Sequence, residues 1–193
     1  MTPRTEPYQA VARTAAQLGF ALVGVAPAIP TKRSEYIRDW LGAGRHGQMA
    51  YLAEKIERRM DPRRLLPGAR SVICVADRHP ATTTLSSQDA QASGKIARYA
   101  WGNDYHEIIK KRLFALADAL REVWPNEEYR TAVDTAPILE REHAVQAGLG
   151  WIGKHTLLIH PDLGSWLLLG QIVTTLAIEV DNESSQRAIP DHC

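Results

Sequence analysis

Cysteine is scarce in this chain of 193 residues, which contains only Cys74 and Cys193. Two cysteines cannot form a disulfide framework, and they do not complete a cysteine-based metal site. Cys74 stands inside the apolar run SVICVA and is expected to behave as a small buried hydrophobic residue. The cysteine count therefore excludes a disulfide-stabilised scaffold and a zinc-ribbon type of protein.

Long apolar runs are also missing. No stretch of the sequence approaches the roughly 20 apolar residues that span a bilayer. The N-terminal sequence MTPRTEPYQAVARTAAQLGF has polar residues every few positions, which is not the pattern of a signal-peptide core. We therefore expect a cytoplasmic protein with no membrane partner.

Neither sign of charge dominates the chain. It has 23 Lys and Arg residues against 22 Asp and Glu residues, for a net charge of +1. Such a balance does not indicate nucleic-acid binding by itself, so any RNA contact must come from a local basic patch or another domain. The stretch KIERRMDPRR (55–64) is one such patch, although a solvated surface is the usual explanation for a charge run.

Common cofactor fingerprints are absent as well. The sequence has no GxGxxG turn, no Walker-type loop and no HExxH helix. Three of the histidines, His46, His106 and His155, do not share a metal-ligand spacing. Short motifs therefore give no chemistry.

Hydrophobic residues make up 45% of the chain, which is the composition of a globular domain. Their spacing alternates between helical and extended periodicity along the sequence. From about residue 181 the chain is polar and reads as a linker, and the polar segment 80–94 reads as a surface loop. The pattern predicts an α+β (mixed α/β) fold with an open three-layer arrangement. The expected helices are 6–18, 33–41, 48–59, 104–123 and 137–147, and the expected strands are 20–26, 71–76 and 129–135, followed by three apolar strand-like stretches after residue 154.

Spacing alone gives most polar residues ordinary roles. Asp134 at a strand end is typical of a turn or helix cap, and Glu140 and Arg141 are typical of solvated helix charges. An aromatic cluster offers two alternatives, which are stacking on a nucleobase or cofactor and packing of a loop onto the next helix. The cluster consists of Tyr99, Trp101, Tyr105 and His106.

Longer strings carry a more specific signal. The sequence contains, in this order, WLGAGRHGQMAYL (40–52), DPRRLLPGARSVI (61–73), GKIARYAWGNDYH (94–106), VDTAPILERE (133–142), AGLGWIGKHTLLI (147–159) and GSWLLLGQIVTTL (164–176). Together they resemble the epoxyqueuosine reductase family from about residue 6 to the end of the chain. The most specific part is VDTAP followed closely by AGLGWIGK.

This resemblance implies a domain organisation. Residues 1–180 would form a cobalamin-binding catalytic domain whose nitroreductase-like fold is similar to that of reductive dehalogenases. Residues 181–193 would lead into a ferredoxin-like segment holding two [4Fe–4S] clusters. Cys193 stands where the first metal-ligating cysteine of that segment would be, and one thiolate alone cannot hold a cluster.

The resemblance also implies a reaction. The family reduces epoxyqueuosine in tRNA to queuosine with electrons from an external donor, and the Asp of its VDTAP string, here Asp134, donates a proton to the epoxide oxygen. An ordinary Asp is ionised at neutral pH, so we expect Asp134 to be buried against the corrin with no cation close to it.

Further site residues follow from the same comparison. The expected substrate contacts are Arg141, Tyr105 and His106. The expected cobalamin contacts are Arg58, Ala97, Asp134, His155, Leu158 and Leu169.

Two departures from the family pattern leave alternatives open. The family string more often has Asn where His155 stands, and we expect no cobalt ligation by this imidazole. The segment 77–79 also departs from its relatives, which have an aromatic there. The rival functions are another cobalamin-dependent reductase of the dehalogenase-like fold, which the Asp of VDTAPILER disfavours because dehalogenases use Tyr as the proton donor, and a cobalamin-binding or RNA-binding module without catalysis.

Overall fold

The computed structural model describes residues 5–79, 97–100 and 103–179, and the expected surface loop at 80–94 and the linker after residue 180 lie outside this part. A four-stranded antiparallel sheet forms the centre, in the order β1-β2-β6-β3. Its strands are β1 (Leu22–Pro27), β2 (Ser71–Arg78), β3 (Tyr129–Ala132) and β6 (Leu167–Thr174). The two central strands, β2 and β6, read as nearly continuous apolar runs because both of their faces are buried.

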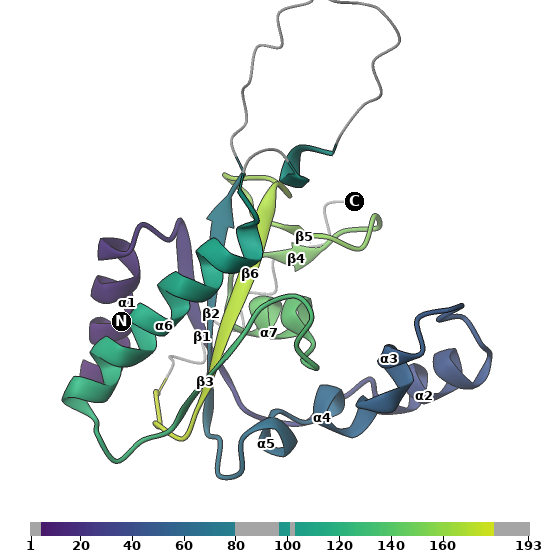
Figure 1. The fold of residues 1–193 in the computed structure, drawn as a ribbon, viewed down its shortest axis with the longest axis horizontal. Coiled ribbons are helices and arrows are strands. Elements are labelled where there is room, and N and C mark those ends of the chain that lie inside the picture. Colours follow the sequence, from purple (N-terminus) through teal and green to yellow (C-terminus); the bar gives the residue numbers. More distant parts are fainter. Residues whose placement is uncertain (1–4, 80–96, 101–102, 180–193) are drawn as a thin grey trace, which may run out of the picture.

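Helices α1 (Glu6–Gln17) and α6 (Tyr105–Val123) cover one face of the sheet, and α7 (Glu140–Gln146) covers the other (Figure 1). This arrangement confirms the expected mixed α/β fold with three layers. A small hairpin of β4 (Trp151–Ile152) and β5 (Leu158–Ile159) follows α7. The described residues contain no helix long and apolar enough to cross a membrane.

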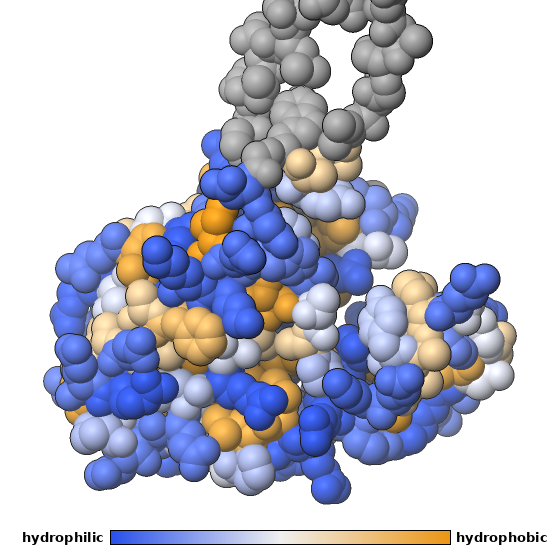
Figure 2. Space-filling view, in the orientation of Figure 1, coloured by the Kyte–Doolittle hydropathy of each residue, from blue (hydrophilic) through white to orange (hydrophobic). Residues whose placement is uncertain are grey.

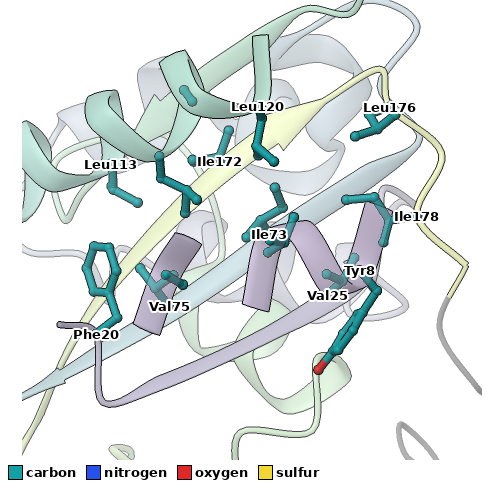
Figure 3. Packing of buried hydrophobic residues seen from close by; sticks show 14 of the residues in the cluster. Tyr8, Phe20, Val25, Ile73, Val75, Leu113, Leu120, Ile172, Leu176 and Ile178 are labelled. Atoms are coloured by element: carbon teal, nitrogen blue, oxygen red, sulfur yellow. The ribbon is translucent and has the colours of Figure 1, made fainter. Parts of the chain in front are cut away.

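The α6 face holds the larger core. Leu113 and Leu120 of α6 point toward Ile73 of β2 and Ile172 of β6, and all four side chains are fully buried (Figure 3). Successive side chains of a strand point to opposite faces of the sheet, so Cys74, which follows Ile73, is buried on the α7 side. Its burial agrees with the expectation from the sequence. Burial also raises the pKa of its thiol, so Cys74 is an inert core residue.

Two glycines allow the helices to approach the sheet closely. A Cβ atom on Gly170 of β6 would lie 2.8 Å from Ile109 Cγ2 of α6, and one on Gly24 of β1 would lie 2.3 Å from the carbonyl oxygen of Ala147. The close packing of α6 and of α7 on the sheet therefore depends in each case on a glycine in a strand.

A separate arm projects from the lower edge of the sheet (Figure 1). It consists of α2 (Ser34–Gly42), α3 (Tyr51–Glu54), α4 (Ile56–Met60) and α5 (Pro62–Leu65). The single helix expected over 48–59 is wrong, because the backbone leaves the helical region at Lys55 and divides the segment into α3 and α4. Helices α2 and α3 contain no buried residue, whereas Met60 of α4 and Leu65 of α5 are buried, so only the outer half of the arm stands away from the core.

Candidate active site

The site is built on the loop between β3 and α7. Asp134 lies in this loop with φ 44°, in the left-handed region that few residues other than glycine adopt. Its backbone N–H donates a hydrogen bond of 2.7 Å to Oε1 of Glu140, the first residue of α7. Asp tolerates the left-handed conformation better than most residues, and the Glu140 carboxyl holds the turn in place.

The side chain of Asp134 is 55% exposed, and its Oδ2 atom lies 2.8 Å from Nε2 of His106. The expected burial of Asp134 is therefore wrong for this structure, and its neighbour is an imidazole, which is a cation only when protonated. The strand ends at Ala132 rather than beyond Asp134, so the loop carries the carboxyl out of the sheet toward the surface.

His106 lies in the first turn of α6 and is held from two sides. Its Nδ1 atom lies 2.7 Å from Oδ1 of Asp104, the residue that caps this helix. The Tyr105 ring stacks on the imidazole with 3.9 Å between centroids and 28° between planes. Burial raises the pKa of Tyr105 to about 12, with a further contribution from the Asp134 carboxylate, so the tyrosine is a hydrogen-bond donor at neutral pH.

Glu140 is not a solvated helix charge, so that interpretation of the sequence is corrected. The pKa of its carboxyl is raised to about 7, mainly by burial and also by the nearby Asp134 carboxylate, against a lowering by the hydrogen bond from the Asp134 backbone. Glu140 therefore changes its protonation state close to neutral pH.

A cleft of about 580 Å³ lies between the arm and the β3–α7 loop. Figure 2 shows the hollow between the arm and the body of the molecule. Its walls combine apolar and aromatic side chains with six charged ones, which include Asp134 and Arg141. The lining residues are Arg33, Tyr36, Ile37, Tyr51, Leu52, Arg59, Asp134, Thr135, Ile138, Leu139, Glu140, Arg141, Glu142, Ile152 and Thr156.

Arg59 is an unexpected member of this cleft. The Nε atom of its guanidinium is buried and has no hydrogen-bond partner within the described ranges. Partial burial also lowers the pKa of Arg59. A buried donor without a partner is costly, so a ligand in this cleft would be expected to offer it an acceptor.

The predicted cofactor residues lie at several places around this region. Arg58 is exposed on α4, and its neighbour Arg59 lines the cleft instead. Ala97 is exposed, and its carbonyl accepts a hydrogen bond from the N–H of Ala100. The structure does not bring the Arg58 side chain to the cleft.

The other predicted cofactor contacts belong to the strands beyond α7. His155 is exposed in the turn of the β4–β5 hairpin, beside Gly153. Leu158 is 3% exposed and packs in the core, and Leu169 of β6 is half-buried. His155, Leu158 and Leu169 are not among the residues that line the cleft.

Arg141 lines the cleft as expected of a substrate contact, and its guanidinium donates to the carbonyl oxygen of Thr156. Tyr105, the second expected substrate contact, also meets Tyr99 edge to face at 6.3 Å. Trp101 of the same aromatic cluster and the expected cluster ligand Cys193 lie outside the described residues.

A second cleft, of about 440 Å³, adjoins the first. It is lined by Asp104, His106, Lys110, Thr131, Ala132, Val133, Thr135 and Ala136. Thr135 lines both clefts, whereas Asp134 belongs to the first and His106 to the second. The Asp134–His106 contact therefore joins the two clefts.

Sequence reasoning missed three of these groups, which are Glu140, Arg59 and Asp104. Asp104 had a readable signal, since an Asp immediately before a helix is a common N-cap. The other two had none, because Glu140 depends on the tight turn at Asp134, and Arg59 differs from Arg58 only in the side of α4 that it faces.

Comparison with known proteins places this geometry in a family context. The family model described as "Epoxyqueuosine reductase QueG, DUF1730" matches residues 59–135. An epoxyqueuosine reductase from Synechococcus sp. (strain RCC307) is 40% identical over 194 aligned residues, covering 95% of this chain and 56% of the relative. The chain thus spans about half the length of the curated relatives that it matches.

Solved structures agree with the sequence comparison. The epoxyqueuosine reductase from Streptococcus thermophilus superimposes with a TM-score of 0.81 at 29% identity, covering 91% of this chain and 47% of that one. A crystal structure of an epoxyqueuosine reductase with an epoxyqueuosine-modified tRNA-Tyr stem loop gives a TM-score of 0.77 at 26% identity, with coverages of 91% and 48%. A B12-dependent reductive dehalogenase, at 16% identity and a TM-score of 0.54, covers 94% of this chain and 21% of its own and shares the fold.

In sequence and in fold the chain matches the epoxyqueuosine reductases, over about half the length of those proteins, which confirms the resemblance that its motifs indicated.

Proposed function

We propose that this chain is the cobalamin-binding catalytic part of an epoxyqueuosine reductase, which reduces epoxyqueuosine in tRNA to queuosine. One observation carries the proposal: the Asp134 carboxyl, hydrogen-bonded to an imidazole, lines a cleft of about 580 Å³ whose walls are part apolar and part charged. The tRNA-bound relative supports the choice of substrate. The full reduction is a proposal for the whole protein, of which the chain spans about half.

The cleft fits cobalamin in its chemistry. Apolar side chains such as Leu52, Ile138 and Ile152 offer surface to a corrin, and the unpaired Nε of Arg59 offers a donor to an amide or phosphate oxygen of its periphery. We expect further contacts from Arg58, Ala97, His155, Leu158 and Leu169, the last two through their backbone. In the whole protein, [4Fe–4S] clusters with Cys193 among their ligands would pass on electrons from an external donor.

Reduced cobalamin, when bound, supplies a strong nucleophile and the electrons for opening a strained epoxide. The chain's own residues supply position and protons. Asp134 would donate a proton to the epoxide oxygen as the C–O bond breaks, so that no free alkoxide has to leave. We expect the nucleoside to be held beside it by Arg141, which lines the first cleft, and by Tyr105 and His106, which lie next to Asp134.

Reconstitution with cobalamin tests the cofactor. We expect a base-off absorption spectrum on binding, and a base-on spectrum or no binding would overturn the cofactor assignment. Arg59→Ala should weaken binding because it removes the buried donor. Arg64→Ala, at an exposed arginine on α5, serves as the matched control.

Turnover tests the activity. With cobalamin and a chemical reductant, the chain should convert an epoxyqueuosine-containing tRNA stem loop slowly, whereas a carrier module would bind cobalamin without conversion. Asp134→Asn should abolish conversion and leave cobalamin binding nearly unchanged. Retained conversion in that variant would remove Asp134 from the role of proton donor, and conversion of an organohalide in place of the stem loop would favour a dehalogenase-like reductase.

A further inference from the structure

We propose that His106, oriented by Asp104, holds the proton that Asp134 delivers, so that the three side chains act as one hydrogen-bonded chain. This inference rests on the proposed function, in which Asp134 is the proton donor. It assigns His106 and Asp104 the role of positioning residues that act through Asp134.

The contact between Asp104 and His106 fixes which nitrogen of His106 carries hydrogen. Oδ1 of Asp104 accepts the backbone N–H of His106 at 2.9 Å and also lies 2.7 Å from Nδ1 of the same residue. The backbone hydrogen bond and the imidazole both lower the pKa of Asp104, so its carboxylate is ionised at neutral pH. An ionised carboxylate only accepts hydrogen bonds, so Nδ1 must donate.

The second contact then requires one more proton. With hydrogen on Nδ1, a neutral imidazole has only a lone pair at Nε2, and Nε2 lies 2.8 Å from Oδ2 of Asp134. A lone pair and a carboxylate do not attract each other. The contact therefore holds either imidazolium with carboxylate or neutral imidazole with carboxylic acid, two states that differ by the position of one hydrogen.

The pair solves a problem that Asp134 alone leaves open. A free aspartic acid is almost fully ionised at neutral pH and has no proton to give. The hydrogen bond to Asp134 raises the pKa of His106, and Asp104 adds to the effect, whereas burial lowers the pKa. The proton is thus stored on a group whose ordinary pKa is already near neutrality.

Other charges around the imidazole do not cancel this effect. Lys110, one turn along α6, lines the second cleft together with His106 and disfavours the imidazolium. Three carboxyl groups act in the opposite sense, namely Asp104, Asp134 and, beyond Asp134, Glu140. Tyr105 stacks on the ring and remains neutral.

The two clefts give the hydrogen-bonded series Asp104–His106–Asp134 a direction. Asp134 lines the first cleft, where cofactor and substrate are proposed to bind, whereas Asp104 and His106 line the second. A ligand that fills the first cleft leaves the second open to water. In one turnover, the Asp134 proton moves to the epoxide oxygen, the Nε2 hydrogen of His106 moves to Asp134, and a proton from solvent then restores the Asp134–His106 pair.

NMR of the imidazole nitrogens in the 193-residue chain tests the chain of hydrogen bonds without any cofactor. We expect neutral His106 to carry its hydrogen on Nδ1 and to titrate above the ordinary histidine range. Asp134→Asn should lower the pKa of His106 by about one pH unit, as should Asp104→Asn, which should also move the hydrogen of the neutral ring toward Nε2.

His160 provides an internal control of opposite tautomer. Its Nδ1 accepts backbone N–H groups from Asp162 at 3.1 Å and Leu163 at 3.3 Å, so its hydrogen belongs on Nε2. Its titration should not respond to either substitution. A neutral His106 with hydrogen on Nε2, or a His106 pKa that is unchanged in Asp134→Asn, would overturn the proposal.

Turnover at two pH values separates proton supply from a purely structural role. In the cobalamin-loaded chain, His106→Gln should reduce conversion at pH 8 by at least about tenfold. The loss should shrink toward pH 5, because Asp134 can then take its proton from solution, whereas an equal loss at both pH values would contradict proton storage. His160→Gln should convert the substrate at the wild-type rate. If the wild type itself shows no conversion, the proposed function fails, whereas the hydrogen-bonded series is still tested by the NMR measurement.

Discussion

Glu140 makes the stability of the chain depend on pH in a direction opposite to that of a salt-bridged carboxylate. Burial raises the pKa of its carboxyl from the ordinary 4.5 to about 7 in the folded state. The folded chain therefore binds the proton more tightly than the unfolded chain. The contribution of this proton to the unfolding free energy is fully present below pH 4.5 and is lost as the pH rises to about 7. The difference between the two pKa values corresponds to about 3 kcal/mol.

Urea denaturation of wild type and Glu140→Gln across pH 4.5 to 8.5, followed by circular dichroism, measures this effect. Glutamine keeps an oxygen that accepts the Asp134 N–H and cannot ionise. The unfolding free energies should be similar near pH 4.5. The variant should become more stable than wild type by about 3 kcal/mol at pH 8.

Glu122→Gln is the matched control, because Glu122 is exposed near the end of α6. Its difference from wild type should stay flat with pH. If the Glu140→Gln difference is also flat, or falls as the pH rises, the Glu140 carboxyl is not buried as described and the reasoning is refuted.

The packing of the sheet gives two further predictions, both measured by urea denaturation at constant pH. Leu113→Ala removes a fully buried side chain from the α6 face and should cost about 2–5 kcal/mol of unfolding free energy, and a cost below about 1 kcal/mol would contradict this core. Gly170→Ala places a Cβ atom 2.8 Å from Ile109 Cγ2 and should cost about 1–3 kcal/mol, whereas Gly42→Ala, with nothing within 4 Å, should be neutral or slightly stabilising. Equal effects of the two glycine variants would argue against close packing of α6 on β6.

The parts of the fold that the sequence predicted well are those with a strong periodic signal. The apolar stripe of α6 and its following Pro125 gave both ends of that helix to within a residue, and the β-branched run of β2 gave a buried strand. These signals work because the residues that define the pattern are the ones that pack. The two-residue strands β4 and β5 are too short to produce such a pattern.

The errors of prediction lie where tertiary contacts override the local signal. The helix expected from residue 137 begins at Glu140, since the left-handed turn at Asp134 and the following Pro137 delay it. That delay gives Glu140 its contact with the loop, and so the residue taken for a solvated charge became part of the site. Only the resemblance to a family singled out Asp134, and its real partners, His106 and Glu140, became visible in three dimensions.

The exposure of Asp134 also suggests how its acidity is controlled. A filled cleft would remove water from the Asp134–His106 pair, and a dry environment disfavours two charges more than two neutral groups. The shared proton should therefore move from His106 to Asp134 when the cleft is occupied, which makes Asp134 an acid at the time it is needed. Adding diamagnetic cob(III)alamin to the chain at pH 7 should shift the His106 Nε2 resonance toward the neutral form and leave His160 unchanged. An imidazolium signal that persists at saturation would show that Asp134 stays ionised, and its proton would then have to come from the substrate side of the cleft.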